Sequence, residues 1–134
     1  MARNASGATT FVVQVRSELA QARRRIRDAA AACTHDRTWL DAVVLAASEV
    51  LTNAIEYGSG GDVDVSMSTA HGSFVMEVTG SSNGIPYRSN EPVPATSVRG
   101  RGLHVVHSIA DQVFIEAMGD RVTVRCTFDP PTPS

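Results

Sequence analysis

Lysine is absent from this chain of 134 residues, whose twelve basic residues are all arginines. A mechanism that depends on a lysine is therefore excluded, including the lysine-bearing phosphate loop and the strand lysine of protein kinases. The net charge of −2 gives no general attraction to nucleic acid or to an anionic membrane. We therefore expect neither of them as a direct partner.

Cysteines and long apolar runs are also scarce. Cys33 and Cys126 lie far apart and match no metal-binding spacing, which favours two small buried side chains in a reducing compartment. The apolar runs fall short of a membrane span, and residues 1–7 contain no apolar signal region. Since 43% of the residues are hydrophobic and 19% are charged, we expect a soluble, globular, cytoplasmic protein.

Periodicity and turn-forming residues predict an ordered series of strands and helices. The predicted strands cover residues 9–16, 63–68, 74–79, 112–117 and 121–128, the last two joined by a turn at Gly119-Asp120. The predicted helices run from Ser17 to about Ala32, from Asp36 or Thr38 to Tyr57 with Gly58 as its cap, and from Gly102 to about Ala110. A turn at 59–61 and a loop over 80–99 complete the chain.

This order of elements predicts an α+β fold. We expect a two-layer sandwich, in which helices cover one face of a mixed, mostly antiparallel sheet. Residues 9–128 would form one domain, with flexible termini at 1–8 and 129–134. A loop as long as 80–99 is unusual inside a compact domain and is typical of a functional lid or binding loop.

Two polar residues one helical turn apart, Glu49 and Asn53, are the first candidate site. Residues at i and i+4 point the same way on a helix, so the carboxylate and the carboxamide would act together. A carboxylate can deprotonate or orient a hydroxyl, and a carboxamide oxygen can help to hold Mg²⁺. The alternative is that these two residues, with Glu56, form the solvated face of an ordinary amphipathic helix.

The second candidate site is Arg99-Gly100-Arg101-Gly102-Leu103. Glycines just before a helix allow backbone amides to approach an anion, and the helix N-terminus favours negative charge. The two arginines add forked donors that match phosphate oxygens. A plain glycine turn is the alternative.

In order and spacing, these motifs resemble the nucleotide-binding boxes of the GHKL superfamily, and most closely those of bacterial anti-sigma factor serine kinases. Glu49-x-x-x-Asn53-Ala54 resembles the first box, and Gly100-Arg101-Gly102-Leu103 resembles the glycine box. The resemblance implies a Bergerat-type histidine kinase-like ATPase fold that holds ATP between the helical layer and the lid loop.

The resemblance also implies a role for each matching residue. Asn53 would coordinate Mg²⁺, and Glu49 would be the catalytic base or would orient the substrate hydroxyl. Gly100 and Gly102 would offer amides to the phosphates, and the neighbouring Arg99, Arg101 and Leu103, with Gly84 of the loop motif, would line the ATP site.

The implied function is that of an anti-sigma factor that works by partner switching. Such a protein binds a sigma factor and phosphorylates a serine or threonine of an anti-sigma factor antagonist. The resemblance also allows a homodimer formed through the first strand and helix. The arginines of 23–27 would then be either a solvated face or a surface for acidic groups of a partner.

Two positions depart from the family pattern. The loop motif of the family reads Asp-x-Gly-x-Gly-Ile, and its aspartate accepts a hydrogen bond from the adenine amino group. Gly80 takes the place of that aspartate and Ser82 the place of the first glycine. Thr79, Ser81 or a bridging water remain as replacements. The alternative function is therefore a non-catalytic, protein-binding regulator with a degenerate nucleotide pocket.

Overall fold

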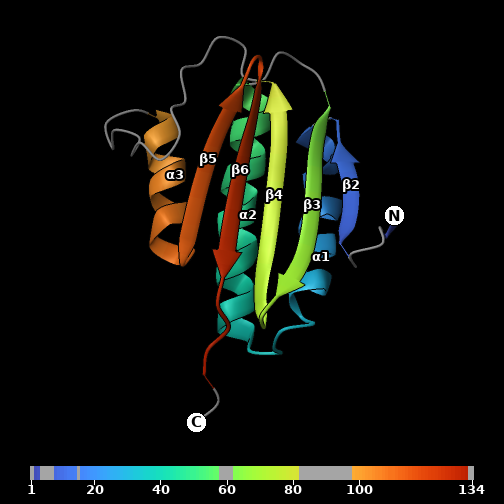
Figure 1. Ribbon diagram of the computed structural model, residues 1–134, viewed down its shortest axis with the longest axis vertical. Helices are drawn as coiled ribbons and strands as arrows, with labels where there is room; N and C mark the ends of the chain where they lie inside the picture. Colours follow the sequence, from blue (N-terminus) through green and yellow to red (C-terminus); the bar gives the residue numbers. More distant parts are fainter. Residues whose placement is uncertain (1, 4–7, 15, 58–61, 82–97, 133–134) are drawn as a thin grey trace.

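The computed structural model describes residues 2–3, 8–14, 16–57, 62–81 and 98–132. Six strands form one sheet in the order β1-β2-β3-β4-β6-β5, and every pairing between them is antiparallel. The strands are β1 (Ala2–Arg3), β2 (Thr9–Val13), β3 (Val63–Ala70), β4 (Ser73–Ser81), β5 (Gln112–Met118) and β6 (Arg121–Phe128) (Figure 1).

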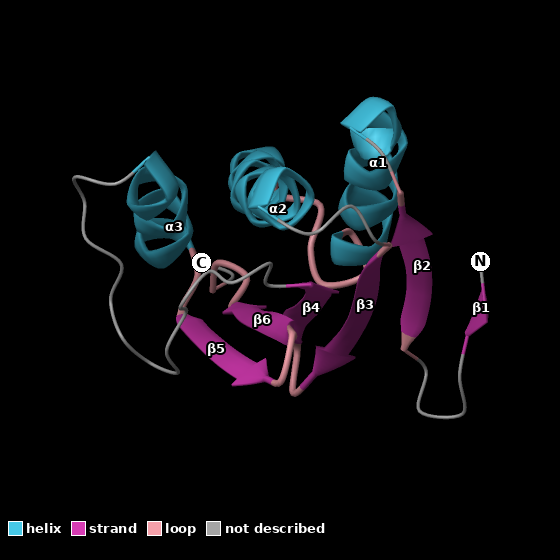
Figure 2. Cartoon of the chain, turned by 90° about the horizontal axis from the view of Figure 1, so that it is seen from above, coloured by secondary structure: helices cyan, strands magenta, loops and turns pink. Residues whose placement is uncertain are grey.

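Three α-helices lie together on one face of this sheet (Figure 2). They are α1 (Leu19–Ala30), which follows the short 3-10 helix η1 (Arg16–Glu18), then α2 (Arg37–Tyr57) and α3 (Val98–Ile109). The central helix, α2, has α1 on one side and α3 on the other (Figure 2). The predicted α+β two-layer sandwich is therefore confirmed, and no parallel pair occurs among the described strands.

Alternation along the strands produces the core between the two layers. Residues of the central strands that face the helices are buried and apolar, while their neighbours face the other side of the sheet. Helix α2 contributes a matching stripe that includes Val43, Ala47 and Leu51, each with 0% exposure. From α1, Leu19, Ala22, Ile26 and Ala30 join the same core.

Two tight turns connect the hairpins, and the one at Gly119-Asp120 is at the predicted position. His71 and Gly72 both have positive φ, 55° and 84°, which is the requirement of a two-residue type I′ turn between β3 and β4. Gly119 has φ 61° at the turn between β5 and β6, a conformation that costs glycine little.

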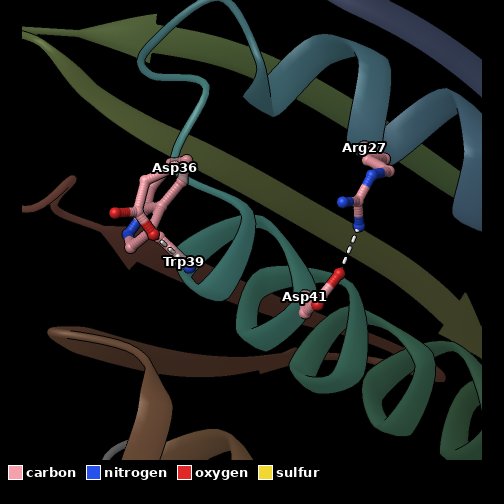
Figure 3. Close-up of polar contacts among 4 residues, drawn as sticks. All are labelled: Arg27, Asp36, Trp39 and Asp41. Atoms are coloured by element: carbon pink, nitrogen blue, oxygen red, sulfur yellow. Dashed lines mark hydrogen bonds and ion pairs between the residues drawn. The ribbon is translucent and has the colours of Figure 1, made fainter.

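The starts of α1 and α2 differ in their chemistry. Asp36 caps α2, because its carboxylate accepts a hydrogen bond of 2.9 Å from the backbone N–H of Trp39 (Figure 3). Helix α1 does not begin at Ser17, so that prediction is wrong: η1 intervenes, and Glu18 occupies the N-cap position without a side-chain cap bond. The carboxylate of Glu18 accepts a bond of 2.6 Å from the N–H of Gln14 instead.

The predicted loop over 80–99 is shorter than expected at both ends. Gly80 and Ser81 continue β4, where they pair with Val122 and Arg121 of β6. Helix α3 begins at Val98 rather than at Gly102. The predicted cap at Gly58, the turn at 59–61 and the rest of the loop lie outside the described residues.

Helix α2 is also apolar along its length. Arg37–Glu56, 20 residues with mean hydropathy 1.2, is long and apolar enough to span a membrane by length and composition alone, contrary to the expectation that the apolar runs fall short of a span. In the fold, the most apolar side of α2 packs against the sheet and is fully buried there. About 33% of this stretch is buried inside the fold, and Leu45, on the outer side of α2, is 51% exposed.

Candidate nucleotide site

Arginines hold α1 against one flank of α2. Arg23 Nε donates to Ser48 Oγ at 2.8 Å, and Arg27 Nη1 donates to Asp41 Oδ1 at 2.7 Å (Figure 3). At the far end of the same pair of helices, Arg16 forms an ion pair with Glu56. Two arginines of the 23–27 cluster therefore bind within the fold, on the flank of α2 that faces α1.

A third member of that cluster contacts the sheet. The guanidinium carbon of Arg25 lies over the ring of Phe11, 5.4 Å from its centroid, which is the geometry of a cation–π contact. Three of these arginines thus have intramolecular partners, a role that neither the solvated-face nor the partner-surface interpretation included.

Asn53 and Glu49 occupy the flank of α2 that is turned away from α1. At about 100° per residue, Asn53 lies about 140° round the helix from Ser48, which faces α1. Helices α2 and α3 contact each other on the other side of α2 (Figure 2). Glu56, the third residue of the predicted polar face, forms an ion pair with Arg16. Glu49 and Asn53 therefore remain as the candidate site residues on α2.

The amide group of Asn53 is incompletely satisfied. Its nitrogen, Nδ2, is buried and has no hydrogen-bond partner among the residues that the structure describes. Burying such a donor without an acceptor costs about 1–3 kcal/mol, so native proteins rarely keep one without a reason. The donor needs an acceptor such as a phosphate oxygen, and the other end of the amide is an oxygen that suits a hard cation.

Glu49 lies one turn before Asn53 and is only half-buried. A half-buried carboxylate keeps access to solvent, and hence to a hydroxyl that another molecule presents. The described residues contain no group of three or more His, Cys, Asp or Glu able to hold a metal ion. A cation at Asn53 would therefore take its other ligands from phosphate oxygens and water, which is the usual way in which Mg²⁺ binds.

Gly80 lies directly beneath the end of α2. A Cβ placed at this glycine would lie 3.7 Å from Cβ of Ala54 and 3.7 Å from Cγ2 of Val63, which is ordinary contact. Ala54 follows Asn53 in the chain, so residue 80 is next to the first candidate box. The position that holds the aspartate in the family's loop motif therefore lies beside Ala54 in this fold.

Thr79 faces the opposite side of the sheet from α2. Its hydroxyl lies 2.8 Å from that of Thr123 on the neighbouring strand. Ser81 shares this face by strand alternation. The expectation that Thr79 or Ser81 replaces the missing aspartate is therefore wrong, because the pleat of β4 directs both side chains away from the helices.

The glycine box lies inside α3 rather than before it. The backbone from Arg99 to Leu103 is helical, in the first turns of a helix that begins at Val98. Glycine costs a helix only about 1 kcal/mol, so the glycine pattern alone could not locate the helix start. In such a helix the N–H of Gly100 is free of intrahelical bonding, whereas the N–H of Gly102 bonds to the first turn.

Gly84, the predicted site residue of the loop motif, lies outside the described residues.

The fold and this polar flank of α2 define a class of proteins. A sequence model of the histidine kinase-like ATPase domain matches residues 12–128. The chain therefore belongs to the histidine kinase-like ATPase family, a family of ATP-binding domains. No curated protein sequence matches the chain significantly.

Proposed function

We propose that this protein is an anti-sigma factor of the serine-kinase type, which binds Mg-ATP and phosphorylates a serine or threonine of an anti-sigma factor antagonist. The observation that carries the proposal is the buried Nδ2 of Asn53, which has no partner among the described residues and lies one helical turn from Glu49. Family membership over residues 12–128 supports the ATP-binding part. The resemblance of the motifs supports the kinase activity and the partners, and the two lone cysteines support a cytoplasmic location.

Each residue of the site has a role in this proposal. Asn53 holds the nucleotide phosphates and Mg²⁺, and the magnesium ion would neutralise phosphate charge. Glu49 orients or deprotonates the hydroxyl of the antagonist. The free N–H groups in the first turn of α3, including that of Gly100, offer donors to the phosphates.

Two measurements test the proposal in sequence. Calorimetry with Mg-ATP should show saturable binding, and the absence of heat at millimolar nucleotide would refute the ATP-binding part. Incubation with γ-labelled ATP and candidate anti-sigma factor antagonists from the same organism should then transfer label to a serine or threonine of one of them.

A second function is favoured by one structural observation. Gly80 offers no side chain beside Ala54, and Thr79 is turned to the other face of the sheet. Under this alternative, the protein regulates its partners by contact alone and its nucleotide pocket is degenerate. Complex formation with the antagonist, without label transfer, would support this function over the kinase.

A further inference from the structure

The face of the sheet opposite the helices, here called the outer face, collects exposed apolar side chains (Figure 2). Of the four large hydrophobic side chains that are exposed among the described residues, three project from it: Val12 on β2, and Phe114 and Met118 on β5. Strand alternation places them there, because Val13 and Ile115 beside them are buried on the helix side. Exposed apolar groups that gather on one surface indicate a binding surface.

Charged residues divide the same face into an acidic part and a basic part. Asp64 on β3 and Glu77 on β4 pair with Arg121 and Arg125 on β6, respectively. These four side chains are between 41% and 58% exposed, so each can take a second partner. From β2 to β5 the outer face is therefore apolar, acidic, basic and again apolar, with Glu116 as the one acid on β5.

A hollow of about 360 Å³ lies over β2, β3 and β4 on the outer face. It is large enough to receive side chains such as Phe114 and Met118, which lie at the opposite edge of the sheet. Its lining residues that face outward are Thr10, Val12, Asp64, Ser66, Glu77 and Thr79. The outer face thus has protruding apolar groups at one edge and a hollow toward the other.

We propose that the outer face binds a second copy of this chain, with the two sheets stacked face to face about a two-fold axis parallel to the strands. The axis reverses the order of the strands, so that β4 lies over β6 of the partner and β3 lies over β5 of the partner. Glu77 then faces Arg125 of the partner subunit, and Phe114 and Met118 lie over the partner's hollow. The acidic part of one copy thereby meets the basic part of the other.

The size of the outer face suits a reversible dimer. Strands β2 to β6 lie about 4.8 Å apart and average about seven residues at about 3.3 Å each, which gives a face of roughly 600 Å². Two such faces would bury about 1,200 Å², the lower end of the range for specific interfaces. This interface differs from one through the first strand and helix, because β5 and β2 lie on opposite sides of the sheet.

Sedimentation velocity of the full chain, from micromolar to millimolar concentration, tests the proposal. We expect a monomer–dimer equilibrium that depends on concentration. Met118→Glu should raise the dissociation constant of the dimer at least about tenfold, because it sets a carboxylate against the acidic part of the partner. Leu45→Glu is the matched control: Leu45 is the fourth exposed hydrophobic residue and lies on α2, so this variant should dimerise as the wild type does.

Three results would overturn the proposal. They are a wild type that stays monomeric throughout the range, equal weakening of the dimer in both variants, and a dimer that Met118→Glu leaves unaffected. The last result would favour an interface through the first strand and helix instead. Circular dichroism verifies that each variant is folded.

A charge exchange provides the complementary experiment. Arg125→Glu should weaken the dimer, because it places a carboxylate opposite Glu77 of the partner subunit. The double variant Glu77→Arg/Arg125→Glu keeps opposite charges both within the chain and across the interface, so it should recover the dimerisation of the wild type. Failure of the folded double variant to recover would show that these charges do not face each other across a two-fold axis, and would overturn the proposal.

Discussion

The indole nitrogen of Trp39, in the first turn of α2, donates a hydrogen bond of 2.8 Å to the backbone carbonyl of Asp129, just beyond β6. Asp129 is held by two further bonds: its N–H donates to Asp111 Oδ2 at 2.6 Å, and its carboxylate accepts from the hydroxyl of Ser73. One residue after the last strand thus joins the start of α2, the start of β4 and the turn before β5.

The Trp39 bond can be removed without removing the aromatic ring. We expect Trp39→Phe to lower the free energy of unfolding by about 1 kcal/mol, the usual net contribution of one hydrogen bond. Urea unfolding followed by far-UV circular dichroism measures this, because Trp39 is the only tryptophan and its fluorescence is lost. A loss above about 3 kcal/mol would show that packing, not the bond, dominates at this position.

Asn53→Ala should separate stability from ligand binding. Because the substitution removes a buried donor that has no partner among the described residues, we expect the free energy of unfolding without nucleotide to stay unchanged or to rise by up to about 2 kcal/mol. Mg-ATP affinity should fall at least about tenfold, as one lost charge-assisted bond implies.

Ser48→Ala, on the flank of α2 that faces α1, is the matched control for Asn53→Ala. It removes the bond to Arg23 and should lower stability by about 1 kcal/mol or less while leaving Mg-ATP affinity unchanged. A strong loss of stability in Asn53→Ala would instead mean that Asn53 has a structural partner.

Glu49→Gln tests the role of the carboxylate as base or orienting group. We expect the rate of phosphate transfer to the antagonist to fall by about a hundredfold or more, because general base catalysis contributes about 10²–10⁴-fold. Mg-ATP affinity should change little. Glu56→Gln is the control, since Glu56 pairs with Arg16, and it should retain transfer. If Glu49→Gln lost Mg-ATP binding instead, its role would be in holding the nucleotide.

The two cysteines should differ in reactivity. Burial raises the pKa of the Cys126 thiol well above its ordinary value, to about 12, and burial also raises the pKa of the half-buried Cys33. At pH 8, a thiol reagent should therefore label Cys33 in the native protein and Cys126 only after unfolding. Rapid labelling of two thiols in the folded protein would contradict the buried position of Cys126.

The raised pKa of Cys126 also predicts a pH dependence of stability. The folded state favours the protonated thiol, while the unfolded state begins to ionise near pH 9. The contribution of this thiol to stability is therefore complete below about pH 9 and decreases as the pH rises toward 12. Urea unfolding of Cys126→Ala should lack this decrease.

Much of the fold could be predicted from local patterns. Alternation of apolar residues located β3, β4, β5 and β6 within a few residues, and Asp36, one of the two predicted starts, caps α2. These predictions succeeded because period-2 burial and capping depend on neighbours in the sequence. The starts of α1 and α3 were misplaced, because a 3-10 turn and helical glycines have weak local signals.

The candidate site was predictable in part. The spacing of Glu49 and Asn53 placed both on one side of α2, since helix geometry alone determines this. It could not show which flank of α2 they occupy, because the arginine bonds to Ser48 and Asp41 that position α1 join residues far apart in the chain. Nor could it show that Glu56 is engaged by Arg16.

By itself, the sequence determined the element order, the α+β class and the two polar residues on α2, because each depends on short-range periodicity. Only the tertiary structure decided what surrounds them. Strand pairing turned Thr79 toward Thr123 and set Gly80 beneath Ala54, and helix packing left Asn53 with a buried, unpartnered donor among the described residues. These relationships follow from long-range register and packing, which local propensity does not encode.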